Sequence, residues 1–279
     1  MATIRIAAMI VKVAMRTKVA MFFTFIFPLL FLFAYDAIFA HGNPSVAAYL
    51  FGPVVTLQIL GSSFFGLGVQ SVVERERGSL RRYRLAPIGP GTMVASNLLA
   101  SYALLLPTVA LLVFCAMFIF HMPLTISILN LWILVTVGMF AFAGFGLTIA
   151  SIANTMQEAQ VYNNVVWFPL LFLSGATFPL PMLPHWVQRV ATFLPATYLV
   201  DTFQGIMSGG QALAAHRSEL VALVISGIFG VLFAWKLFRW EKDEPILRSR
   251  QLMAGAFIVP FIIMGVWMNS HSTFSASWS

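Results

Sequence analysis

Long apolar runs with almost no charge constrain this chain more than any other feature. Between Ala20 and Val73 the only charged residue is Asp36, and hydrophobic residues make up 60% of the sequence. A water-soluble domain cannot bury that much apolar surface, whereas a bilayer accommodates it in helices of about 20 residues. Lipid offers no hydrogen bonds to the backbone, so the segments must satisfy their own. The sequence therefore predicts an all-α integral membrane protein.

Runs of span length predict six crossings and a shorter seventh. The seventh run has about 17 residues, the lower limit for a span, so an interfacial helix is its alternative. We expect an amphipathic segment at 1–18, a six-span domain at 19–240, and a cytoplasmic segment plus the seventh run within 241–279. The expected spans are residues 19–40, 50–72, 93–120, 130–153, 160–179, 219–238 and 251–269.

The basic residues predict the orientation. All lysines and arginines except Arg189 and Arg217 lie before the first run, in the loop after the second, or in the segment after the sixth. These three regions fall on one side of the membrane, and positive charge marks the cytoplasmic side. We therefore expect a multi-pass protein of the inner (plasma) membrane with a cytoplasmic N-terminus. The seventh span would place the C-terminus outside.

Two shorter amphipathic regions are also expected. In residues 1–18, Arg5, Lys12 and Arg16 lie within about 40° of one another on a helix, which favours an interfacial position. A frayed terminus carrying positive charge is the alternative. Between the fifth and sixth spans, prolines divide the chain into apolar pieces at 184–194 and 195–207, each too short to cross. These pieces predict a re-entrant or interfacial helix pair.

The loop after the second span is densely charged. It reads ERERGSLRRYRL over residues 74–85. Gly78 permits a sharp turn, Ser79 can cap a helix, and Pro87 bars its continuation. The pattern predicts a short basic helix along the cytoplasmic surface that docks a partner. An ordinary positive-inside loop with acidic gatekeepers is the alternative.

Several function classes lack their motifs. No GxxxxGK[ST] phosphate loop occurs, so we expect no ATP hydrolysis by this chain. Protease motifs are absent from the sequence. The histidines are scattered without the spacing of metal ligands. The basic residues gather on one side of the membrane, as insertion requires, and so give no sign of nucleic-acid binding. We expect no catalytic residues, bound metal, cofactor or nucleic acid. Ion-coupled secondary transport is the main alternative, although the polar residues predicted at mid-depth are neutral; an intramembrane enzyme is a weaker one.

Two motifs resemble a known family. ERERGSLRRYRLAPI at 74–88, and FLSGATFPLPMLPHWVQRVATFLPATYLVDTFQGIM at 172–207, look like the signatures of ABC type 2 permeases, the membrane subunits of ATP-binding-cassette exporters. The first motif opens the coupling helix of that family. By this resemblance Glu74, Arg75, Glu76, Gly78 and Ser79 match its opening, and Pro87 matches its closing proline.

The resemblance implies a six-span type 2 exporter bundle and its partners. A nucleotide-binding subunit would hold ATP and Mg and dock on the N-terminal helix and coupling helix. A second permease copy or paralogue would complete the path for a drug-like, lipid or glycan cargo, with membrane lipid around it. The implied coupling residues are Glu74, Arg75, Glu76, Arg77, Gly78, Ser79, Arg81, Arg82, Arg84 and Pro87; the candidate path or gate residues are Gln58, Ser62, Ser63, Asn163, Asn164, Phe172 and Phe178.

Overall fold

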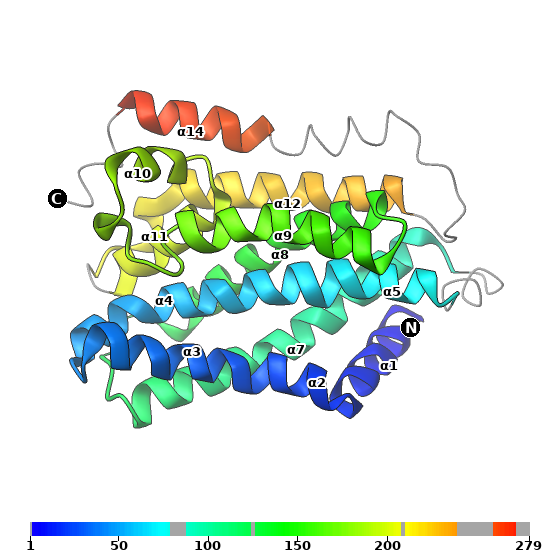
Figure 1. Cartoon of the computed structure of the whole chain (residues 1–279), viewed down its shortest axis with the longest axis horizontal. Helices are drawn as coiled ribbons and strands as arrows, with labels where there is room; N and C mark the ends of the chain where they lie inside the picture. The colour runs from blue at the N-terminus through cyan, green and yellow to red at the C-terminus, as the bar shows by residue number, and fades with distance from the viewer. Residues whose placement is uncertain (1, 79–87, 124–125, 208–209, 239–258, 272–279) are drawn as a thin grey trace.

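The computed structural model describes residues 2–78, 88–123, 126–207, 210–238 and 259–271. Every regular element in this part of the chain is a helix, which confirms the all-α prediction. The long helices run side by side along the longest axis of the molecule, with α1 and α5 at one end and α10 and α11 at the other (Figure 1). The predicted coupling residues beyond Gly78 lie outside the described residues.

Five helices are long and apolar enough to cross a membrane: Lys18–Ala40, Pro44–Glu76, Pro90–Phe118, Ile128–Ile152 and Leu213–Leu237. They agree with the predicted first, second, third, fourth and sixth spans. The first of these helices is made of α2 (Lys18–Met21), η1 (Phe22–Ile26), α3 (Phe27–Tyr35) and η2 (Asp36–Ala40), and the second of α4 (Pro44–Gly61), η3 (Ser62–Val69) and α5 (Gln70–Glu76). The third is α7 (Pro90–Phe118) and the fourth is α8 (Ile128–Ile152). The fifth is made of η5 (Leu213–His216) and α12 (Arg217–Leu237).

The second of these helices is longer than predicted. It contains 33 residues, about 50 Å at 1.5 Å per residue, against a hydrocarbon core of about 30 Å. Its charged end at α5 must therefore project beyond the membrane. The central part, η3, is π-helical, with backbone hydrogen bonds from residue i to i+5.

The remaining two predicted spans correspond to α9 (Met156–Leu173) and α14 (Val259–His271). α9 is not among the five apolar helices, because its first half carries glutamine, glutamate and asparagine. It also ends six residues before the predicted 179, since Ser174 ends the helix and Gly175 takes a φ of 87°. Residues 251–258, the start of the predicted seventh span, lie outside the described part, and α14 is also not among the five apolar helices. A crossing by α9 or by α14 therefore stays a prediction.

The core centres on α8, which packs against α12 and η3. Its closest crossing is with η3 at Gly68 and Gly146. A Cβ atom on Gly146 would lie 2.0 Å from the carbonyl oxygen of Ser63, and one on Gly68 would lie 2.8 Å from the carbonyl oxygen of Gly146. Small residues permit such backbone approach between membrane helices, where it increases van der Waals contact.

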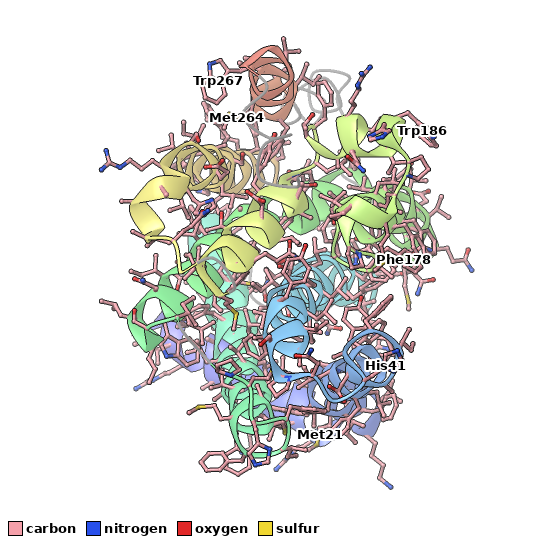
Figure 2. The ribbon with its side chains drawn as sticks, turned by 90° about the vertical axis from the view of Figure 1, so that its left-hand side faces the viewer. Met21, His41, Phe178, Trp186, Met264 and Trp267 are labelled. Atoms are coloured by element: carbon pink, nitrogen blue, oxygen red, sulfur yellow. The ribbon has the colours of Figure 1, made fainter. Side chains whose placement is uncertain are left out.

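The expected short helices are present at both ends of the bundle. α10 (His185–Ala191) and α11 (Pro195–Met207) form at the positions predicted for the helix pair, and α11 is almost entirely buried against α4 and α12. Figure 2 views this end and shows Trp186 of α10 and Trp267 of α14 at the periphery. Because α11 is enclosed by helices, it belongs to the bundle core and does not lie on the surface.

The N-terminal segment forms α1 (Ala2–Arg16), as predicted, and packs on α7. Its buried face contains Ile6, Ala7 and Ile10. At 100° per residue the exposed basic stripe lies on the opposite side. The apolar side chains of Ile4 and Met15 are exposed, which suits contact with lipid.

Gly146→Ala should destabilise the protein by about 2 kcal/mol, because the added methyl group overpacks the crossing with η3. Gly66→Ala is the matched control, since nothing lies within 4 Å of a Cβ at that position. Thermal unfolding of the purified proteins in detergent measures both effects. Equal unfolding temperatures for the two variants would contradict the tight crossing.

Candidate functional site

Arg75 and Glu76 join the charged end of α5 to the connection between α8 and α9; we call this pair the charged clamp. The Arg75 side chain is buried, and its Nη1 donates to the carbonyl oxygen of Ala150 at 2.9 Å. Its Nη2 donates to the carbonyl oxygen of Ala153. Ala150 lies in the last turn of α8 and Ala153 is its C-cap. Helix carbonyls lack partners there, and a cation opposes the negative end of the helix dipole.

Glu76 serves the other side of the same connection. Its Oε2 accepts a hydrogen bond of 2.9 Å from the backbone N–H of Met156, the first residue of α9. Within the connection, the Thr155 hydroxyl accepts from the N–H of Glu158, and Glu158 Oε2 accepts from the N–H of Asn154. Negative groups at a helix start satisfy free N–H groups and favour the dipole. Two adjacent residues of α5 therefore hold the end of α8 and the start of α9.

The other predicted coupling residues occupy different environments. Glu74 is half-buried and accepts a hydrogen bond from Gln70 at 3.4 Å, whereas Arg77 is exposed. Gly78 has a φ of 71°, which confirms that it makes the expected turn. Arg75 lies inside the molecule, where it holds helices of this chain together, and not at a surface that a partner could reach. Ser79, Arg81, Arg82, Arg84 and Pro87 lie outside the described residues.

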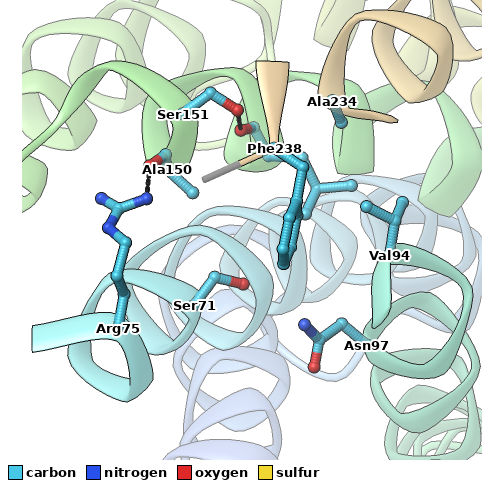
Figure 3. Close-up of a pocket in the computed structure, with 9 residues that line it drawn as sticks. Ser71, Arg75, Val94, Asn97, Ala150, Ser151, Ala234 and Phe238 are labelled. Carbon is cyan, nitrogen blue, oxygen red and sulfur yellow. Dashed lines mark hydrogen bonds between the residues drawn. The ribbon is translucent and has the colours of Figure 1, made fainter. Parts of the chain in front are cut away.

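A small cavity lies beside the clamp. Its walls include Arg75, Ser71, Asn97 and Phe238. Figure 3 shows these residues and the hydrogen bond from the Arg75 guanidinium to the carbonyl oxygen of Ala150. The volume of about 20 Å³ has room for a single water molecule. This cavity is too small to hold an organic cargo.

Three predicted path residues are buried in contacts of this chain. Gln58 Nε2 donates to the carbonyl oxygen of Thr24 at 3.3 Å, and the hydroxyl of Thr108 donates to that oxygen at 3.1 Å. Ser63 Oγ contacts Met139 Sδ at 3.4 Å. Asn163 is fully buried, and neither its amide nitrogen nor its amide oxygen has a hydrogen-bond partner among the described residues. Gln58 and Ser63 thus hold helices together.

The other four predicted residues reach a surface shared by η3 and α9. Ser62 is half-buried there, Asn164 is exposed, and Phe172 and Phe178 are each 42% exposed. The rings of Phe168 and Phe172 stack at 6.0 Å between centroids, and those of Phe172 and Phe178 stack at 6.4 Å. Trp167 connects this stack to Phe65 of η3. We call these residues the η3–α9 face: Ser62, Phe65, Gly66, Asn164, Val165, Trp167, Phe168, Phe172 and Phe178.

Sequence reasoning missed Phe65, Phe168 and the capping residue Glu158. The helical spacing of Val161, Asn164, Val165, Phe168 and Phe172 could have grouped them on one face. Nothing in the sequence says that this face is uncovered. Likewise, the charge pattern at 74–77 does not show that Arg75 is buried while Glu76 and Arg77 are exposed.

Comparisons with known proteins agree on one class. Residues 5–208 match the family model for the ABC-2 type transporter. The chain is 27% identical to "ABC transporter G family member 20" of Dictyostelium discoideum, over 75% of this chain and 29% of that protein. It is 25% identical to "Probable multidrug ABC transporter permease YbhS" of Escherichia coli (strain K12), over 65% of this chain and 48% of that protein.

A third relative has a different printed role. The chain is 26% identical to "Nodulation protein J" of Sinorhizobium fredii, over 67% of this chain and 72% of that protein. The chain spans less than half the length of the first two relatives. The similarity therefore concerns a membrane region that proteins of different names share.

Arg75→Met should lower the free energy of unfolding by about 3 kcal/mol, because two charge-assisted hydrogen bonds of about 1.5 kcal/mol each are lost. Arg77→Met removes the same charge from an exposed position and should change the free energy of unfolding little. Thermal unfolding in detergent compares the two variants. A larger loss for Arg77→Met would refute the clamp.

Proposed function

The chain belongs to the ABC-2 type transporter family, and we propose that it is the membrane permease subunit of an ATP-driven exporter. ATP and Mg would be held by a separate nucleotide-binding subunit, and this chain would perform no catalysis. The observation that carries the proposal is the charged clamp, which joins the coupling segment to both α8 and α9. A displacement of that segment would move two helices of the bundle together.

A docking site for the nucleotide-binding subunit is proposed at the clamp end of the bundle. α1 and α5 lie at the same end (Figure 1), and their exposed basic residues include Arg5, Lys12, Arg16 and Arg77. Arginine offers a fixed fork for carboxylates, so a partner with an acidic docking surface fits this end. ATP binding would draw two such partners together and tilt the attached helices.

The path for cargo is proposed along the η3–α9 face, between this chain and a second permease subunit. Phe65, Val165 and Phe168 are exposed there, and a Cβ on Gly66 would meet nothing. Aromatic and aliphatic side chains with one exposed amide, that of Asn164, suit an amphipathic cargo such as a drug-like molecule, a lipid or a lipid-linked glycan. We propose export across the inner membrane, which the family membership and the basic residues on the predicted cytoplasmic side support.

Purification from native membranes in mild detergent should recover a stoichiometric subunit with a GxxxxGK[ST] phosphate loop, identified by mass spectrometry. In the reconstituted complex, Arg81→Glu with Arg82→Glu should abolish stimulation of ATP hydrolysis, because charge reversal removes the docking contacts. Reversing two arginines on the predicted outer side, Arg189 and Arg217, is the control. A chain that purifies alone and moves solute under an ion gradient would refute the proposal.

Val165→Cys in a Cys115→Ser background should cross-link two copies in native membranes, because Val165 is 67% exposed at the centre of the η3–α9 face. A short bismaleimide and gel electrophoresis measure the yield of dimer. Leu30→Cys on α3 is the control, since Leu30 is also exposed but lies off this face. Dimer formation through Leu30→Cys alone would place the subunit contact elsewhere.

A further inference from the structure

Three ionisable side chains meet at the end of the bundle opposite the charged clamp. Asp201 comes from α11, His216 from η5 and Glu219 from the first turn of α12. Each offers one ligand atom, and these atoms all lie within 4.8 Å of one another. His216 Nδ1 is 3.8 Å from Asp201 Oδ2. The cluster takes no part in the coupling site or the η3–α9 face.

The cluster holds two acidic side chains close together in a largely buried place. His216 and Glu219 are more than nine-tenths buried, and the Asp201 side chain is 14% exposed. Two carboxylates held this close together repel each other where water is scarce, and a divalent cation bound between them would relieve that repulsion.

Neighbouring groups fix the orientation of two of these side chains, those of His216 and Glu219. The His216 ring occupies the space next to Gly205, where a Cβ would lie 2.6 Å from Nε2. That buried Nε2 has no hydrogen-bond partner among the described residues. Ser218 Oγ donates to Glu219 Oε2 at 2.9 Å, the kind of supporting bond that fixes a ligand carboxylate.

We propose that Asp201, His216 and Glu219 form a binding site for a divalent transition metal ion, with zinc the best match. One imidazole nitrogen and two carboxylate oxygens are ordinary zinc ligands, and three protein ligands leave a fourth position for water. Bonds of 2.0–2.2 Å require ligand atoms about 3.3 Å apart. His216 Nδ1 and Asp201 Oδ2 are 3.8 Å apart, so the side chains must move closer by about 0.5 Å to hold the ion. A bound ion would tie α11 to the start of α12.

The test uses the full chain with an affinity tag that contains no histidine. After treatment with EDTA, cobalt(II) should produce visible absorption bands at one equivalent per chain, and zinc should abolish them. Zinc should also raise the temperature of thermal unfolding. Asp201→Asn and Glu219→Gln keep the side-chain shape and should each weaken zinc binding at least 10-fold. His185→Gln removes an exposed histidine of α10 outside the cluster and should bind as the wild type does.

Two results would overturn the site. The first is a wild-type protein that shows neither cobalt bands nor a zinc-dependent rise in unfolding temperature. This measurement does not depend on the folding of any variant. The second is equal zinc affinity in Asp201→Asn and His185→Gln, which would assign the binding to other residues. Neither outcome depends on ATP hydrolysis or on the proposed transport function.

Discussion

The free backbone groups where α8 ends and α9 begins set the arrangement of this bundle. A helix end in or near a membrane needs partners for its carbonyl or N–H groups, and water is scarce there. Arg75 supplies donors to α8 and Glu76 an acceptor to α9. Because the two residues are adjacent, α5 is fixed against both helices, and η3 is held where Gly68 meets Gly146. Hydrogen bonding at one end and close packing further along thus support each other.

The sequence predicts much of the fold and less of the site. Hydropathy locates five spans well, because bilayer thickness fixes the length of an apolar helix. It misplaces the end of α9, since the apolar run continues past the residue where Gly175 turns the chain. It also groups Arg75 with the surface arginines, although the side chain is buried. Charge pattern reports the side of the membrane but not the direction in which a side chain points.

For polar residues within the spans, too, the sequence does not show the direction in which a side chain points. Gln58 and Ser63 are good candidates for a path by residue type, yet both bond within the chain. Asp201 and Glu219 are separated by 17 intervening residues, so no motif spacing could indicate that they meet. Such groupings depend on how α11 enters the bundle, which is a tertiary property. The family assignment narrows the fold and the partners but leaves these placements to the structure.

The crossing of Gly68 with Gly146 has a mechanical consequence. Gly68 is 8 residues from Glu76 and 24 residues from Pro44 along one continuous helix, or about 12 Å and about 36 Å at the α-helical rise. The clamp and the crossing both tie the shorter of these two segments to α8, so that segment should move with α8 as one rigid unit.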